Sequence, residues 1–128
     1  PFIETDKIFL MIGTNDLSSL QTVDYIVSNY ANILERIKIE SPETKVYVQS
    51  ILPTEDALHT TRQNGDIMLI NKQLKKMAEE RGLVYIDIFT PFATSDNKLN
   101  LDYSIDGLHL NGAGYQLWKK LIEGYVAK

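Results

Sequence analysis

Two short motifs contain side chains whose types and spacing could support catalysis, and the first is Asp106-Gly107-Leu108-His109. Histidine titrates close to neutral pH, and a carboxylate within reach can fix its tautomer and stabilise its cation, as a general base requires. Gly107 permits a tight turn that would bring Asp106 onto the imidazole three residues later. The alternative is a plain turn with a surface carboxylate beside a half-buried histidine. The motif alone leaves both interpretations open.

The second motif is Gly13-Thr14-Asn15-Asp16, which comes directly after an apolar run from Ile8 to Ile12. Gly13 lets the backbone approach a ligand closely, and the amide NH2 of Asn15 could donate to an oxygen that develops negative charge. Alternatively, Asn15 or Asp16 simply caps the helix that follows. These four residues do not decide between the two interpretations.

Other kinds of site find little support in the sequence. The chain has two histidines, His59 and His109, no cysteine, and no ligand pair at a metal-binding spacing, so we predict neither a metal nor another cofactor. No glycine-rich phosphate loop follows an expected strand, which disfavours a nucleotide-binding domain. His59, Arg62 and Tyr103 could border a substrate pocket, although a solvated loop explains each of them more simply.

Charge and hydropathy argue against two kinds of partner. The 128 residues have a formal net charge of −4, with acidic and basic residues interspersed, so no basic stripe suggests a nucleic-acid partner. No apolar stretch approaches the roughly 18 residues that would span a bilayer. The length fits one domain. Because the first residue is Pro1 rather than Met, localisation stays open between a secreted or periplasmic and a cytoplasmic site.

Alternating strands and helices must position the two motifs. Apolar runs at residues 8–12, 46–52 and 83–89 predict strands, the first of them covered on both faces. Apolar residues at three- and four-residue steps predict three helices, with Gly82 ending the second and Asn111 capping the third. This order predicts an α/β fold with a parallel sheet and helices on both sides. Long irregular stretches at residues 53–65 and 90–110 follow the carboxyl ends of strands, where parallel sheets bind ligands.

Taken together, the two motifs resemble blocks III and V of the SGNH hydrolases, also called the GDSL esterase/lipase family. The resemblance covers nearly the whole chain and is closest to the subgroup similar to platelet-activating-factor acetylhydrolase and bacterial carbohydrate O-acetylesterases. It implies a flavodoxin-like, three-layer α/β/α SGNH hydrolase fold that lacks the family's first two strands. The supporting stretches are "VYVQSILP", "INKQLKKMAEERGLVYIDIFTPF" and "YSIDGLHLNGAGYQLW".

The resemblance also implies a role for each motif residue. Asn15 becomes a side-chain donor of the oxyanion hole, His109 the general base and then acid, and Asp106 its orienting carboxylate. Gly13 is the motif glycine, and Asp16 has a supporting structural place. Family members hydrolyse acetyl or short acyl esters through a serine acyl-enzyme without a metal, so we expect a small ester substrate, with carbohydrate esters first among the choices.

The chain departs from the family pattern at the nucleophile. The family's serine belongs to a Gly-Asp-Ser motif after its first strand, and a glycine after its second strand supplies another oxyanion donor. Neither is found here, and Ser18, Ser19, Ser50 and Ser104 all have settings that suggest structural roles. We therefore expect residues 1–128 to be the carboxyl-terminal portion of a single SGNH hydrolase domain, inactive alone, with two upstream strand-and-helix units of roughly 30 residues each. The alternative is a non-catalytic binding or interaction module that retains the fold without the nucleophile.

A further expectation concerns association. In the family's sheet order, 2-1-3-4-5, the first strand lies against the run from Ile8 to Ile12. Without that strand, an apolar edge would be open to pairing. We expect the chain to be unstable alone, or to associate through this edge with an amino-terminal fragment or another copy.

Overall fold

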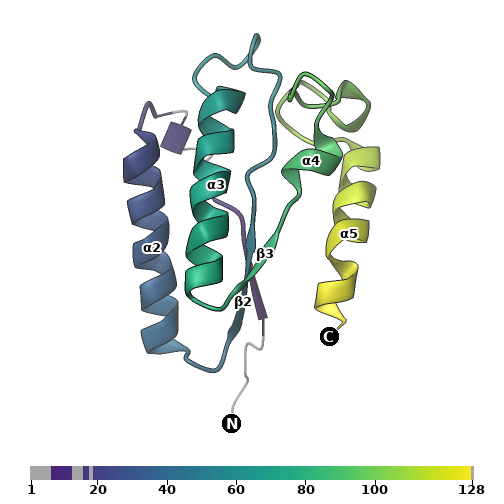
Figure 1. Cartoon of the computed structure of the whole chain (residues 1–128). Helices are drawn as coiled ribbons and strands as arrows, with labels where there is room; N and C mark the ends of the chain where they lie inside the picture. Colours follow the sequence, from purple (N-terminus) through teal and green to yellow (C-terminus); the bar gives the residue numbers. More distant parts are fainter. Residues whose placement is uncertain (1–6, 13–15, 18, 128) are drawn as a thin grey trace.

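The fold is a three-stranded parallel sheet covered by helices on both faces (Figure 1). The computed structural model describes residues 7–12, 16–17 and 19–127. Its strands lie in the order β1-β2-β3, so the alternation predicted from the sequence is confirmed. The elements, in chain order, are β1 (Lys7–Leu10), α2 (Val23–Glu40), β2 (Lys45–Gln49), α3 (Asn64–Glu80), β3 (Val84–Ile86), α4 (Phe89–Phe92), the 3-10 helix η1 (Leu101–Tyr103) and α5 (Gly112–Val126).

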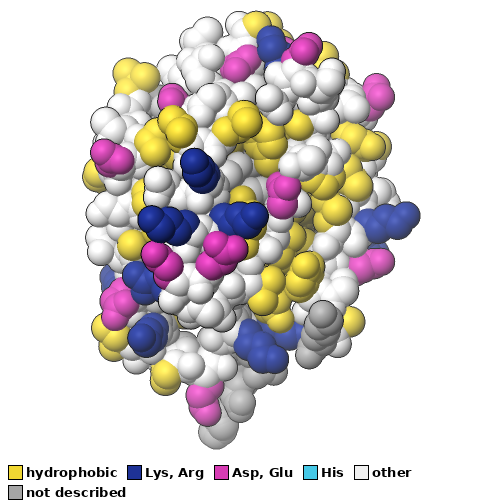
Figure 2. Space-filling view, in the orientation of Figure 1, with side chains coloured by type: hydrophobic (Ala, Val, Ile, Leu, Met, Phe, Trp, Pro, Cys, Tyr) yellow, Lys and Arg dark blue, Asp and Glu magenta, His cyan; other side chains and the backbone are white. Residues whose placement is uncertain are grey.

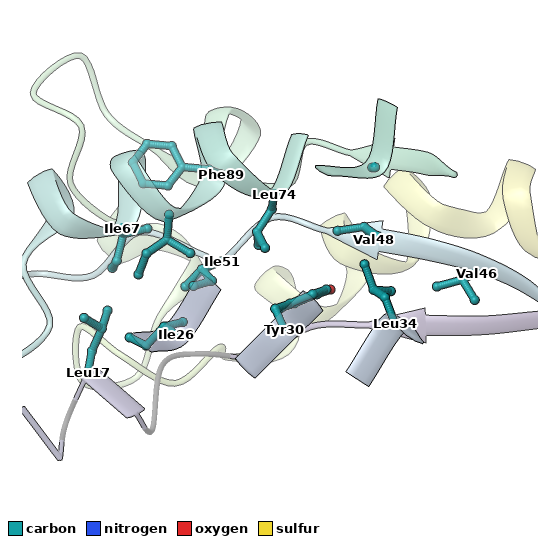
Figure 3. Packing of buried hydrophobic residues seen from close by; sticks show 12 residues of the cluster. Leu17, Ile26, Tyr30, Leu34, Val46, Val48, Ile51, Ile67, Leu74 and Phe89 are labelled. Carbon is teal, nitrogen blue, oxygen red and sulfur yellow. The ribbon is translucent and has the colours of Figure 1, made fainter. Parts of the chain in front are cut away.

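The side chains of β2 alternate between the two layers of helices. Val46 and Val48 pack on one face with α2 and α3, in the cluster shown in Figure 3. Tyr47 faces the other side and packs against α5. Gln49 points the same way, and its Oε1 accepts a hydrogen bond of 2.8 Å from Nε1 of Trp118 in α5. This period of two produces the predicted three-layer α/β/α arrangement.

The strands are shorter than the apolar runs that predict them. The second run extends to residue 52, but β2 ends at Gln49, and the third extends to residue 89, but β3 ends at Ile86. Ile51 and Ile88 lie beyond the ladders and are still 1% and 0% exposed. Apolar composition reports burial, whereas a strand also needs a neighbouring backbone with which to pair, so the runs overstate strand length.

The helix ends agree with the sequence. Gly82 follows α3 with a φ of +68°, a left-handed conformation that glycine adopts without penalty. Oδ1 of Asn111 accepts from the Gly114 amide at 2.9 Å and so caps α5, as predicted. None of the described helices is both long and apolar enough to cross a membrane. On the face shown in Figure 2, basic and acidic side chains intermingle, and apolar side chains gather between α3 and α5.

Candidate active site

Asp106 and His109 are in direct contact within one turn. Oδ2 of Asp106 lies 2.7 Å from Nδ1 of His109, while Oδ1 accepts from the backbone amides of Leu108 at 2.9 Å and His109 at 2.7 Å. Because an ionised carboxylate only accepts hydrogen bonds, Nδ1 of His109 must donate. In the neutral imidazole this leaves the lone pair on Nε2, which is the form that can take a proton.

The same hydrogen bonds set the charge of Asp106. The His109 ring is the largest cause that holds the pKa of Asp106 well below its usual range, and the backbone amides of His109 and Leu108 act in the same direction. Asp106 is therefore ionised at neutral pH. Its charge is placed to stabilise an imidazolium, although both side chains are exposed, His109 by 70% and Asp106 by 45%.

The backbone around the pair is folded by local hydrogen bonds. Gly107 has a φ of +84° and is buried. Ser104 Oγ accepts from the Gly107 amide at 2.8 Å and donates to the His109 carbonyl at 2.7 Å. The Ile105 amide donates to the same carbonyl at 3.0 Å. Ser104 thus has a structural role in this turn, as the sequence suggests.

Asn111, the N-cap of α5, joins the end of the turn to the residues that precede it. The Asn111 amide donates to the Tyr103 carbonyl at 3.0 Å, and Nδ2 of Asn111 donates to the Asp102 carbonyl at 3.0 Å. The ring of Tyr103 packs edge-on against Phe92, with centroids 5.5 Å apart. Tyr103 therefore supports the loop by packing and backbone contacts.

The segment after β2 supports the other side of the turn. The Glu55 amide donates to the Gly107 carbonyl at 2.8 Å, and Nε2 of His59 lies 3.0 Å from the Asp106 carbonyl oxygen. The Arg62 carbonyl accepts from Thr54 Oγ1 within the same segment. Sequence reasoning places His59 beside a possible pocket and does not detect this contact. Most hydrogen bonds between the segment after β2 and the turn involve backbone atoms. Backbone contacts cannot be recognised from residue types, so the sequence does not reveal them.

The second motif is only partly described. Gly13 and Asn15 lie outside the described residues, so the predicted meeting of Asn15 with His109 stays a prediction. The Asp16 carbonyl accepts from the amides of Ser19 at 3.1 Å and Gln21 at 3.0 Å. Leu17, which follows Asp16, packs into the core with Ile26 and Ile67 (Figure 3). Because the three strands are parallel, β1 ends at the same edge of the sheet as β2 and β3. The chain after β3 contains the turn with Asp106 and His109, and the segment after β2 supports that turn.

The hydrogen bonds of the serine hydroxyl groups indicate whether a described serine could act as the nucleophile. Ser50, which the sequence places within a strand, follows β2 instead, and its buried Oγ accepts from the amides of Ile88 and Phe89 at 2.9 Å each. Ser18 lies outside the described residues. Within residues 7–12, 16–17 and 19–127, no serine hydroxyl hydrogen bonds to the imidazole of His109.

Several hollows in the described part of the chain lie away from the pair, and two of them border the sheet. One of about 410 Å³ includes Pro42, Val46 and Leu83, at the opposite edge of the sheet. Another of about 500 Å³ lies beside α3 and β3 and includes Lys72 and Tyr85. Neither includes Asp106 or His109. Among the described residues, no group of three or more His, Cys, Asp or Glu side chains is arranged to hold a metal ion.

Comparison with known proteins gives one family and several similar structures. The sequence profile of the GDSL-like Lipase/Acylhydrolase family matches residues 1–117. A Streptococcus pneumoniae protein provisionally assigned as a platelet activating factor has 30% identity and a TM-score of 0.86 over 94% of this chain and 59% of its own. A GDSL-like lipase from Bacteroides thetaiotaomicron has 24% identity and a TM-score of 0.83 over 95% and 62%.

A lipase/acylhydrolase from Enterococcus faecalis has 21% identity and a TM-score of 0.78, over 94% of this chain and 60% of its own. The chain therefore spans about three fifths of the length of these solved structures. It matches none of the curated proteins with which it was compared.

Proposed function

Because the chain belongs to the GDSL-like lipase/acylhydrolase family, we propose that it hydrolyses esters through a serine acyl-enzyme, with His109 as general base and Asp106 as its orienting carboxylate. The observation that supports these roles best is the 2.7 Å contact between Asp106 Oδ2 and His109 Nδ1. This contact leaves Nε2 of His109 as the proton acceptor, as serine catalysis requires.

The proposed reaction has two steps. Nε2 of His109 takes the proton of the serine hydroxyl as its oxygen attacks the ester carbonyl, and the imidazolium returns that proton to the departing alkoxide. Water then attacks the acyl-serine with His109 again as base, which releases the carboxylic acid and restores the serine. Asp106 stays ionised throughout and stabilises the imidazolium.

We propose that the side-chain amide of Asn15 donates a hydrogen bond to the oxyanion. Gly13 would allow close approach of the backbone, and Asp16 would support the motif. A donor placed in advance stabilises the tetrahedral oxyanion, and losing one typically costs about 3 kcal/mol of transition-state stabilisation. This assignment comes from the family resemblance, since Asn15 is outside the described residues.

The proposal needs a nucleophile in addition to the described serines, because none of their hydroxyl groups hydrogen bonds to the imidazole of His109, and Ser50 and Ser104 are engaged in backbone contacts. We propose that a serine of a further chain segment supplies it, and that these residues form the carboxyl-terminal portion of one hydrolase domain. The proposed substrates are acetyl or short acyl esters, first of carbohydrates, on the strength of the subgroup that the sequence resembles.

The test is hydrolysis of p-nitrophenyl acetate and of an acetylated sugar by the natural protein at full length. We expect His109→Ala to abolish turnover and Asn15→Ala to slow it about 100-fold or more. Asp106→Asn should slow it by as much as about 10⁴-fold, because the wrong tautomer of His109 is then favoured. Asp96→Asn is the matched control, because Asp96 is an exposed acid of the same loop.

Turnover that survives His109→Ala would refute the assigned roles. Absence of turnover by the wild-type protein on any short acyl ester would instead favour the non-catalytic binding module.

A further inference from the structure

The segment from Glu55 to His59 lies directly against the turn that holds Asp106 and His109. The Glu55 amide donates to the Gly107 carbonyl at 2.8 Å, and Nε2 of His59 is 3.0 Å from the Asp106 carbonyl oxygen, 47 residues away in sequence. The two backbones also pack tightly: a Cβ added to Gly107 would lie 2.8 Å from Cβ of Glu55. Two successive carbonyls of the turn are thus bound from one side.

The hydrogen bond between His59 and the Asp106 carbonyl can have only one direction. A backbone carbonyl oxygen accepts and never donates, so Nε2 of His59 must carry a hydrogen. His59 therefore has the opposite tautomer to His109 when both are neutral: His59 donates from Nε2, and His109 donates from Nδ1. Nε2 of His59 therefore cannot accept a proton while it makes this bond.

The segment is itself held in place. Backbone Thr54 accepts from the Leu99 amide at 3.1 Å, and Asn64 binds both the amide and the carbonyl of Thr54 at 2.8 Å each. Lys98 Nζ lies 3.3 Å from Glu55 Oε1 and 3.6 Å from Asp56 Oδ1. These contacts connect the segment to α3 and to the loop before the turn, so it offers a fixed surface.

We propose that His59 is a positioning residue for the general base: it donates to the Asp106 carbonyl and, with the Glu55 amide, fixes the turn that aims the imidazole of His109. The inference rests on the proposed function for its catalytic meaning. Because the side chains of Asp106 and His109 are exposed, packing restricts them little, and their orientation depends on their mutual hydrogen bond and on the bonds that hold the backbone of the turn. A displacement of a catalytic group by about 1 Å can cost about 100-fold in rate.

The test compares His59→Gln with His59→Asn. The amide nitrogen of Gln is as many bonds from Cβ as Nε2 of His, whereas that of Asn is one bond shorter and cannot reach the carbonyl. Thr61→Ala is the control, because Thr61 is exposed in the same loop and its side chain makes no hydrogen bond to the Glu55 to His59 segment or to the turn among the described residues.

The first readout is NMR of the natural protein at full length, which needs no turnover. We expect the hydrogen-bonded Nδ1 proton of His109 to broaden in His59→Asn and the pKa of Asp106 to rise towards its ordinary value. His59→Gln and Thr61→Ala should match the wild type. The proposal is overturned if His59→Asn keeps the wild-type Nδ1 resonance and Asp106 titration in a folded chain.

The second readout is kinetics of the natural protein on p-nitrophenyl acetate. We expect His59→Asn to lower kcat about 10- to 100-fold with KM within about twofold, and His59→Gln to recover most of the loss. Equal losses in the two variants would contradict the positioning role. If His109→Ala retained activity, the proposed function would fail, and the NMR comparison would still decide whether His59 holds the turn.

Discussion

Gly107→Ala tests the packing of the two loops most directly. The substitution adds a methyl group at a φ of +84° and places it 2.8 Å from Cβ of Glu55. A Cβ has no rotatable freedom of its own, so Glu55 can yield only if its backbone moves. That backbone also donates to the Gly107 carbonyl, so the same movement would lengthen this hydrogen bond.

The expected cost has two parts. A left-handed conformation costs a residue with a Cβ about 1 to 2 kcal/mol, and forcing an extra methyl group into a packed site typically costs about 1 to 3 kcal/mol. We therefore expect Gly107→Ala to lower the free energy of unfolding by about 2 to 5 kcal/mol. Gly82→Ala separates the two parts, because Gly82 has a φ of +68° and nothing within 4 Å of its added Cβ. That control should lose only about 1 to 2 kcal/mol.

The assay is urea unfolding followed by circular dichroism, with linear extrapolation to water for the wild type and both variants. A cost for Gly107→Ala equal to that for Gly82→Ala would show that the contact with Glu55 is loose. That result would refute the tight packing of the two loops and, with it, one support for the positioning role of the Glu55 to His59 segment.

Asp106, Trp118 and the edge strand β1 each give a further prediction. Because its pKa is depressed in the folded chain, Asp106 stabilises the fold above its unfolded pKa of about 3.9, and this contribution is lost as the pH falls towards the folded value. Asp106→Asn should flatten this part of the acid dependence in urea unfolding between about pH 5 and pH 2; an unchanged slope would contradict the reasoning. Trp118→Phe removes the donor to Gln49, which is 2% exposed, and should lower the free energy of unfolding by about 1 to 3 kcal/mol. Adding Gln49→Leu should recover part of this loss in the same urea assay. Among the described strands β1 pairs with β2 alone, so the chain should associate through β1, and Ile8→Lys should shift gel filtration towards monomer; a wild-type monomer would oppose this.

The sequence predicts the layered fold well because its signals are periodic. Val46, Tyr47 and Val48 are apolar at consecutive positions of β2, and such an unbroken run is typical of a strand covered on both faces. Gly82 and Asn111 mark helix ends by local chemistry, which depends on few neighbours, and both are confirmed. Burial periodicity and capping are local properties, so one sequence is enough to detect them.

The support of the candidate site depends on properties that a sequence does not display. The contact between Asp106 and His109 follows from a spacing of three residues and is predictable. The contacts of Glu55 and His59 with that turn join distant backbone atoms, and any residue at position 55 other than proline could supply the same amide. Nor does a sequence distinguish a serine that binds backbone, such as Ser50, from one that is free to react. Only its hydrogen bonds do so.

An exposed base needs a rigid backbone more than a buried one does. The walls of a packed cavity restrict a side chain from every direction, whereas the His109 ring, 70% exposed, is restricted mainly by Asp106 and by the turn beneath both residues. A small change in that turn therefore moves the imidazole without meeting steric resistance. For this reason residues outside the Asp106–His109 pair, such as Gly107 and His59, should affect catalysis, because together with Asp106 and Ser104 they determine where Nε2 of His109 points.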